Sequence, residues 1–125
     1  MSGLRIRRID AALKEVLAGV LAKGLKDPRI GFVTVTEVRT SPDLRTAMVY
    51  VSALEADGSE PTPGRQAELL AGLESAHGYL QRCLARELRL KRTPKLSFHY
   101  DDTPQRAARV SRLLSRPSPQ QGEGT

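Results

Sequence analysis

Apolar residues near the start of the chain recur at three- and four-residue steps, the spacing that places them on one face of an α-helix. These residues are Ile9, Leu13, Val16, Leu17, Val20 and Leu21, and charged residues lie between them. The pattern predicts an amphipathic helix from Ile9. Gly24 can take the left-handed conformation that ends a helix, and Pro28 prevents the same helix from resuming.

Two β-strands are predicted next, at residues 32–39 and 46–54. β-branched residues dominate the first segment, and apolar and polar side chains alternate along much of the second. Turn-forming residues, Ser41 to Asp43, separate the two, so we expect the strands to pair as antiparallel neighbours. Residues 55–64 contain two glycines and two prolines and predict an exposed loop.

A second helical pattern runs from Arg65 to Leu88 and is interrupted at Gly72 and at residues 75–78. Glycine with serine nearby weakens a helix and is a recognised cause of kinking. We therefore expect two helices separated by a kink.

The last predicted elements are a strand at residues 95–100 and a short helix at residues 104–114, both indicated by their apolar spacing. Residues 116–125 are polar and contain proline and glycine, so we expect a disordered tail there. A chain of 125 residues fits one domain with one core, and we place that domain at residues 1–115.

The predicted order is α-β-β-α-kink-α-β, an α+β arrangement in which helices cover one face of a three-stranded sheet. The long helical crossover between the second and third strands indicates that these two strands are parallel. This order matches a type II KH-like domain. A fold alone does not establish a function, so the site has to be argued separately.

Basic residues outnumber acidic ones by 20 to 14, giving a net charge of +6, which favours polyanions as partners. Most of the excess is local: the segment from Arg82 to Lys95 has six basic residues and one acidic residue, Glu87. The six are Arg82, Arg86, Arg89, Lys91, Arg92 and Lys95, here called the basic stripe. The first three are spaced four and three apart, which places them on one face of the second helical segment. The competing interpretation is a charged face that only keeps the protein soluble.

Two smaller basic groups are further candidates for RNA contact. One consists of Arg5, Arg7 and Arg8, and the other of Lys26 and Arg29. A structural role is equally open for both, because N-terminal arginines often only solvate a chain end and Arg29 can brace its turn.

The chain contains five aromatic residues and no tryptophan. They are Phe32, Tyr50, Tyr79, Phe98 and Tyr100, and their positions in strand and helix patterns predict core packing. Sequence-specific reading of single-stranded RNA relies largely on aromatic stacking. We therefore expect recognition through phosphates, 2′-hydroxyls and RNA shape.

Enzymatic and membrane functions find little support. The lone cysteine, Cys83, cannot form an internal disulfide and fits a reducing cytoplasm, and no run approaches the roughly 20 apolar residues of a membrane span. His77 and His99 lack the spacing of zinc ligands, and no familiar catalytic motif is present. We expect no metal, no cofactor and no catalysis, with a small RNA nuclease using either histidine as the enzyme alternative.

Several segments resemble the ribosome-binding factor A family. In the first half they are residues 26–38 (KDPRIGFVTVTEV), 41–44 (SPDL) and 47–51 (AMVYV), and in the second half residues 76–80 (AHGYL), 90–96 (LKRTPKL) and 98–101 (FHYD). They occur in one collinear order across residues 5–115, and together they are specific.

The resemblance implies a KH-like domain in which an Ala-x-Gly kink replaces the usual GxxG loop, matched here by Ala76, His77 and Gly78. It also implies binding to the free small (30S) ribosomal subunit and assistance in late maturation of its 16S ribosomal RNA near the 5′-terminal helix. We expect a cytoplasmic monomer. A generic KH-type RNA-binding adaptor and a protein-interaction module remain open alternatives.

Overall fold

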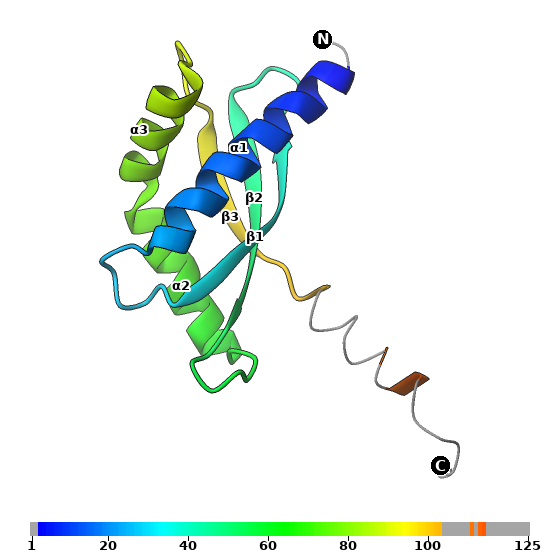
Figure 1. Ribbon diagram of the computed structural model, residues 1–125, viewed down its shortest axis with the longest axis vertical. Helices are drawn as coiled ribbons and strands as arrows, with labels where there is room; N and C mark the ends of the chain where they lie inside the picture. Colours follow the sequence, from blue (N-terminus) through cyan, green and yellow to red (C-terminus); the bar gives the residue numbers. More distant parts are fainter. Residues whose placement is uncertain (1–2, 104–110, 112, 115–125) are drawn as a thin grey trace.

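The helices and strands of the computed structural model follow the predicted order (Figure 1). The structure describes residues 3–103, 111, 113 and 114. The elements are α1 (Gly3–Lys23), β1 (Phe32–Thr40), β2 (Thr46–Leu54), α2 (Pro63–Ser75), α3 (His77–Leu88) and β3 (Lys95–Tyr100). The predicted tail and nearly all of the predicted last helix at 104–114 lie outside the described residues, so the end of the domain at residue 115 stays a prediction.

Helix α1 packs on the core through a stripe of leucines. Leu13, Leu17 and Leu21 are buried, and Gly24 follows with a φ of 87°, in the left-handed region where glycine carries no steric penalty. The helix begins at Gly3, earlier than predicted. Apolar periodicity marks only the turns that pack on the core and misses the mostly exposed turns before them.

The sheet has the order β1-β2-β3, with β1 and β2 antiparallel and β2 and β3 parallel, as predicted. β1 carries a bulge at Thr36, between the residues paired with Tyr50 and Val51. The Thr36 hydroxyl donates a hydrogen bond of 2.7 Å to Asp101 Oδ2, just beyond β3. The bulge thereby fastens one edge strand to the end of the other.

One face of the sheet is covered by all three helices, as Figure 1 shows for α1 and α3. The buried side chains of the sheet that meet them are Val35, Val38, Ala47, Val49, Val51 and Leu96, and those of the helices are Leu13, Leu17, Leu21, Leu69, Leu73, Leu80 and Leu84. The core is therefore aliphatic, in keeping with the low aromatic content.

The start of α2 shows a signal that the sequence prediction overlooked. Thr62 is the N-cap, and its Oγ1 accepts a hydrogen bond of 3.2 Å from Arg65 N. Pro63 takes the first helical position, where an N–H would have no partner within the helix. The helix therefore starts before the predicted Arg65, and the predicted loop at 55–64 is shorter by its last two residues.

Gly72, predicted to interrupt α2, instead marks a close contact within an intact helix. A Cβ at this position would lie 2.9 Å from Ile30 Cγ1 and 3.4 Å from Asp27 Oδ2. The glycine lets the turn at residues 27–30 rest directly on the helix backbone. This contact positions the loop after α1 beside the kink.

Among the elements that the structure describes, α1, α2 and α3 all lie on one face of the sheet, and the other face exposes apolar side chains. Phe32, at the start of β1, is 72% exposed and pairs in register with Leu54, which is 48% exposed. Met48, further along β2, is 39% exposed.

Candidate nucleic-acid interface

The kink between α2 and α3 is a break at a single residue, Ala76. Its φ of −89° and ψ of 4° lie in the bridge region outside the regular helix. The Ala76 N–H bonds back to Gly72 O and Leu73 O, both at 3.1 Å, which completes α2, and Leu80 N bonds to Ala76 O at 2.9 Å, which opens α3. The break falls where the kink was predicted.

His77 and Gly78, the other two residues of the kink, have different tasks. His77 Nε2 accepts a hydrogen bond of 2.9 Å from Leu96 N, which ties α3 to β3. Gly78 is exposed, and a Cβ there would meet only Arg82 Nη1, at 3.6 Å. Packing within the described protein does not require a glycine at this position, whereas close approach by an external backbone would.

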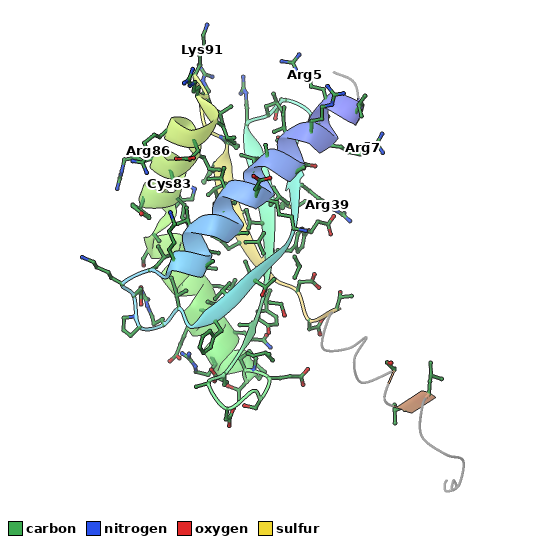
Figure 2. The ribbon with its side chains drawn as sticks, viewed as in Figure 1. Arg5, Arg7, Arg39, Cys83, Arg86 and Lys91 are labelled. Atoms are coloured by element: carbon green, nitrogen blue, oxygen red, sulfur yellow. The ribbon has the colours of Figure 1, made fainter. Side chains whose placement is uncertain are left out.

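The basic stripe is exposed along its whole length. Within the part of the chain that the structure describes, none of its six members takes part in an ion pair. In Figure 2, Arg86 projects from α3 and Lys91 stands at the tip of the loop that follows. These cationic groups are therefore available to bind phosphate oxygens.

Arg89 does not lie on the α3 helix, contrary to the prediction. α3 ends at Leu88, and Arg89 is the C-cap with a φ of 53° and a ψ of 42°. The left-handed conformation turns the chain away from the helix axis, so the four-and-three spacing places only Arg82 and Arg86 on one helix face. Arg89 instead begins the basic loop that carries Lys91 and Arg92.

This basic loop is held at its far end by α3. Gln81 Nε2 donates a hydrogen bond of 2.9 Å to Pro94 O, and the bond from Leu96 N to His77 follows soon after it. The loop therefore leaves α3 at a defined turn and returns to it. The cations of the basic loop therefore lie on a segment that is anchored to α3 at both ends.

The N-terminal group, Arg5, Arg7 and Arg8, is also exposed. Asp10 Oδ1 accepts a hydrogen bond of 2.8 Å from Thr40 N, which sets the start of α1 beside the β1–β2 turn. Lys95 N donates to Arg45 O of the same turn at 2.8 Å. The structure thus brings the N-terminal group and the loop end of the stripe to the same end of the molecule (Figure 2).

In the third group, Arg29 acts as a brace. Its Nε donates to Asp27 Oδ1 at 2.9 Å and its Nη2 to Ser75 Oγ at 3.1 Å, so it joins the turn after α1 to the last residue of α2. The hydrogen bonds from Arg29 lower the pKa of the Asp27 carboxyl from 3.8 to about 2. Lys26 is exposed beside this braced turn and remains a candidate for phosphate contact.

The sequence model of the family described as ribosome-binding factor A matches residues 5–114. The chain belongs to the ribosome-binding factor A family. It is 47% identical to the ribosome-binding factor A of Anaeromyxobacter sp. (strain K) over 111 residues, which cover 88% of this chain and 76% of that relative.

A crystal structure of a family member and a homology model fitted into a cryo-EM map resemble this structure. The crystal structure of ribosome-binding factor A from Thermus thermophilus is 34% identical, has a TM-score of 0.61, and covers 76% of this chain and 93% of its own. A homology model of the T. thermophilus factor, fitted into the cryo-EM map of a complex between the 30S subunit and ribosome-binding factor A, is 34% identical with a TM-score of 0.59 and covers 74% and 91%. The predicted type II KH-like fold, with its Ala-x-Gly kink, is confirmed.

The ribosome-binding factor A family is named for binding, and the two histidines of the enzyme alternative lie apart. His77 and His99 lie on opposite faces of the sheet: His77 contacts Phe98 edge-on, with ring centroids 6.5 Å apart, whereas His99 Nε2 lies 2.8 Å from Ser97 Oγ. No group of side chains in the described part of the chain could hold a metal ion. Across the same residues, no helix has the length and apolar character to cross a membrane.

Three aromatic residues of this ribosome-binding factor A family member were wrongly predicted to lie in the core. Phe32 is 72% exposed and Tyr79 is 47% exposed, and Tyr50 lies beside His99 on the sheet face away from α1, α2 and α3. Tyr79 precedes the buried Leu80 and therefore lies about 100° away from it around the helix, a signal that the sequence contained. Phe98 and Tyr100 do pack against the core.

Proposed function

We propose that this protein is a ribosome maturation factor that binds the free 30S subunit through its basic stripe. It assists late maturation of 16S ribosomal RNA near the 5′-terminal helix, and it acts in the cytoplasm as a monomer, without a cofactor and without catalysing a reaction. The observation that carries the proposal is the set of six exposed cations on α3, the basic loop and the start of β3, none in an ion pair within the described chain, on a member of this family. The 30S complex of the T. thermophilus relative supports the choice of subunit.

The mechanism is selective binding of one RNA conformation. α3, the basic loop and β3 set the backbone positions from which the cationic side chains extend, so an RNA fold that brings phosphates within their reach gains charge-assisted hydrogen bonds that other folds do not. A ligand shifts a conformational equilibrium by its difference in affinity for the two states. A basic surface can therefore favour one fold of the RNA without breaking or forming a covalent bond.

The test is co-sedimentation of the purified protein with free small subunits, large subunits and joined ribosomes at low and moderate salt. We expect selective and salt-sensitive binding to the free small subunit. Equal binding to all three particles would indicate the generic KH-type RNA-binding adaptor, and salt-insensitive binding would indicate a protein-interaction module.

Charge reversal locates the binding surface. The double variant Arg86→Glu/Arg89→Glu should lose small-subunit binding while keeping its circular dichroism spectrum, because both side chains are exposed. The control is Lys14→Glu/Arg39→Glu, which changes the net charge equally at exposed positions outside the stripe. Unchanged binding by the first variant, or equal loss in both, would remove the stripe from the proposal.

A further inference from the structure

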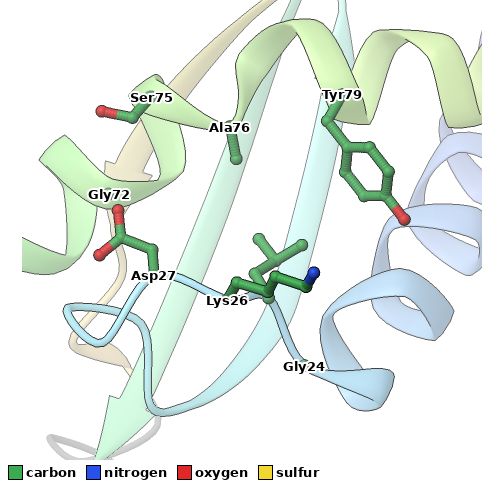
Figure 3. Close-up of a pocket in the computed structure, with 8 residues that line it drawn as sticks. Gly24, Lys26, Asp27, Gly72, Ser75, Ala76 and Tyr79 are labelled. Atoms are coloured by element: carbon green, nitrogen blue, oxygen red, sulfur yellow. The ribbon is translucent and has the colours of Figure 1, made fainter.

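A pocket opens beside the kink, between the loop that follows α1 and the α2–α3 junction (Figure 3). Its volume is about 400 Å³, in the range of small-ligand sites. The lining residues are Gly24, Leu25, Lys26, Asp27, Gly72, Ser75, Ala76 and Tyr79. The close contact at Gly72 and the Arg29 brace fix its two walls relative to each other.

Tyr79 forms one wall of this pocket, and its side chain is not part of the hydrophobic core. Its side chain is 47% exposed although its neighbours Leu80 and Cys83 are buried. Figure 3 shows the ring extending from α3 towards the last turns of α1, on the side of the pocket opposite Asp27 and Ser75. An exposed aromatic ring beside an apolar pocket can stack against an aromatic ring of a ligand.

The charges around the pocket favour an anionic chain at its mouth. Lys26 is exposed at the rim, and the one carboxylate in the lining, Asp27, is already neutralised by Arg29. A second hollow of about 310 Å³ shares Gly24 and Tyr79 with the first and runs between α1 and α3. Its charged lining residues are Lys23 and Arg86 against Glu15 and Glu87, so the charges of this second hollow balance. The excess of positive charge therefore lies at the first pocket and along the stripe.

We propose that the pocket at the kink receives one unpaired nucleobase of an RNA strand, which stacks on Tyr79 while Lys26 contacts the adjoining phosphate. This inference rests on the proposed function, since it assumes that the ligand of the stripe is RNA. Gly78 lies next to Tyr79 and leaves room for the ribose-phosphate backbone. The site would give a protein with few usable aromatic residues one fixed point of base contact among its phosphate contacts.

The chain has no tryptophan, so Tyr79→Trp introduces a single tryptophan reporter that can still stack. We expect its emission to be quenched by a short single-stranded adenine oligoribonucleotide titrated to saturation, and also by free small subunits. The matched control is Tyr50→Trp, on the sheet face away from α1, α2 and α3, whose emission should stay unchanged. Absence of quenching of Tyr79→Trp by the oligoribonucleotide would overturn the proposal.

Affinity measurements test the same site without a reporter. Stacking of one base on an aromatic side chain contributes about 1–3 kcal/mol, so Tyr79→Leu should weaken small-subunit binding by roughly 5- to 100-fold with an unchanged salt dependence. Tyr79→Phe keeps the ring and should bind within about twofold of the unaltered protein. Equal binding by Tyr79→Leu and the unaltered protein would overturn the pocket and leave the proposed function intact.

The two proposals can fail separately. If the unaltered protein does not bind small subunits, the proposed function fails, and quenching by the oligoribonucleotide still decides the pocket. If Tyr79→Leu loses subunit affinity but neither RNA nor subunits quench Tyr79→Trp, the occupant is an apolar protein side chain and the nucleobase proposal is overturned.

Discussion

Gly72 and Gly78 lie on either side of the kink and have opposite surroundings. The turn at residues 27–30 presses against Gly72, whereas Gly78 faces open space apart from the end of the Arg82 side chain. Both looked like helix-weakening residues in the sequence. In the structure, Gly72 is required by a contact within the protein, whereas Gly78 would be required only by a binding partner.

Substitution of each glycine by alanine should therefore change stability in opposite directions. Gly72→Ala should lower the free energy of unfolding by about 1–3 kcal/mol, because the added methyl overlaps Ile30 and the turn must shift. Gly78→Ala should raise it by up to about 1 kcal/mol, because alanine is the better helix former. Urea unfolding of the three proteins provides the comparison.

Subunit binding supplies the second half of this test. Gly78→Ala should bind small subunits more weakly in spite of its greater stability. A variant that is both more stable and binds equally well would show that the kink surface does not approach RNA closely.

The Asp27 carboxylate makes the stability contributed by the braced turn depend on pH. Its pKa in the folded protein is about 2, below the ordinary value of 3.8, so the unfolded chain takes up this proton more readily than the folded one. The contribution of Asp27 to stability is present above about pH 4 and is lost as the pH falls from about 4 to about 2. The stability difference between the unaltered protein and Asp27→Asn should shrink over that interval in acid-dependent urea unfolding.

Asp57 is the control for this prediction, because its own pKa is lowered by Ser59 in a different loop. Asp57→Asn should leave the pH dependence that is assigned to Asp27 in place. If Asp27→Asn and the unaltered protein differ by the same amount at both ends of the acid range, ionisation of Asp27 makes no contribution to stability.

The residue after α3 shows what escapes sequence reasoning even where the boundary is predicted correctly. The apolar pattern ends at Leu88, as α3 does, but no glycine or proline follows until Pro94, so nothing local indicates that Arg89 takes a left-handed conformation. The helix ends because the chain must turn back to reach β3, where tertiary contacts hold Leu96 and Pro94. Arg89 adopts the left-handed conformation as a consequence of that return.

Replacing Arg89 by glycine should separate fold from function. Glycine takes the left-handed conformation without the Cβ penalty, so Arg89→Gly should leave stability unchanged or raise it by up to about 1 kcal/mol. It also removes a cation from the stripe and should weaken small-subunit binding.

Arg89→Ala is the matched control, since it removes the same charge and keeps the backbone strain. It should bind as weakly as Arg89→Gly and be the less stable of the two in thermal unfolding. Full binding by both variants would exclude Arg89 from the interface.

The α2 boundary and the strands illustrate the opposite case. Thr62 and Pro63 are standard start signals, so the early start of α2 was readable from the sequence. The order of elements, the antiparallel and parallel pairings and the leucine stripe of α1 were all predicted correctly, because each rests on periodicity within a segment or on the length of a connection. The Gly72 contact and the Arg29–Ser75 bond join segments far apart in the chain, and no local pattern encodes them.

At the scale of the whole molecule, the basic groups extend from Lys26 near the kink, along Arg82 and Arg86, to the loop and the start of α1. If about five to eight of these groups contact phosphate, the logarithm of the binding constant should fall by roughly 4–7 for each unit increase in the logarithm of salt concentration. The positions of these groups, and not the net charge of +6 alone, should set that dependence.

Neutralising single cations should therefore change the salt dependence selectively. Arg86→Gln should reduce the slope by about 1, whereas Arg39→Gln, on the face away from α1, α2 and α3, should leave it unchanged. Sedimentation assays over a range of potassium chloride concentrations measure both slopes. Equal slopes for all three proteins would mean that the stripe does not displace counterions.

The parallel pairing of β2 with β3 also determines how the chain acquires its fold. Residues 46–51 pair with residues 95–100 across a connection that contains α2 and α3, so this ladder closes a long loop and we expect it to form slowly. β1 and β2 need only their short turn and can pair early. Because the stripe depends on contacts of α3 with Leu96 and Pro94, its geometry is complete only when the last strand joins, and a partly folded chain cannot present it.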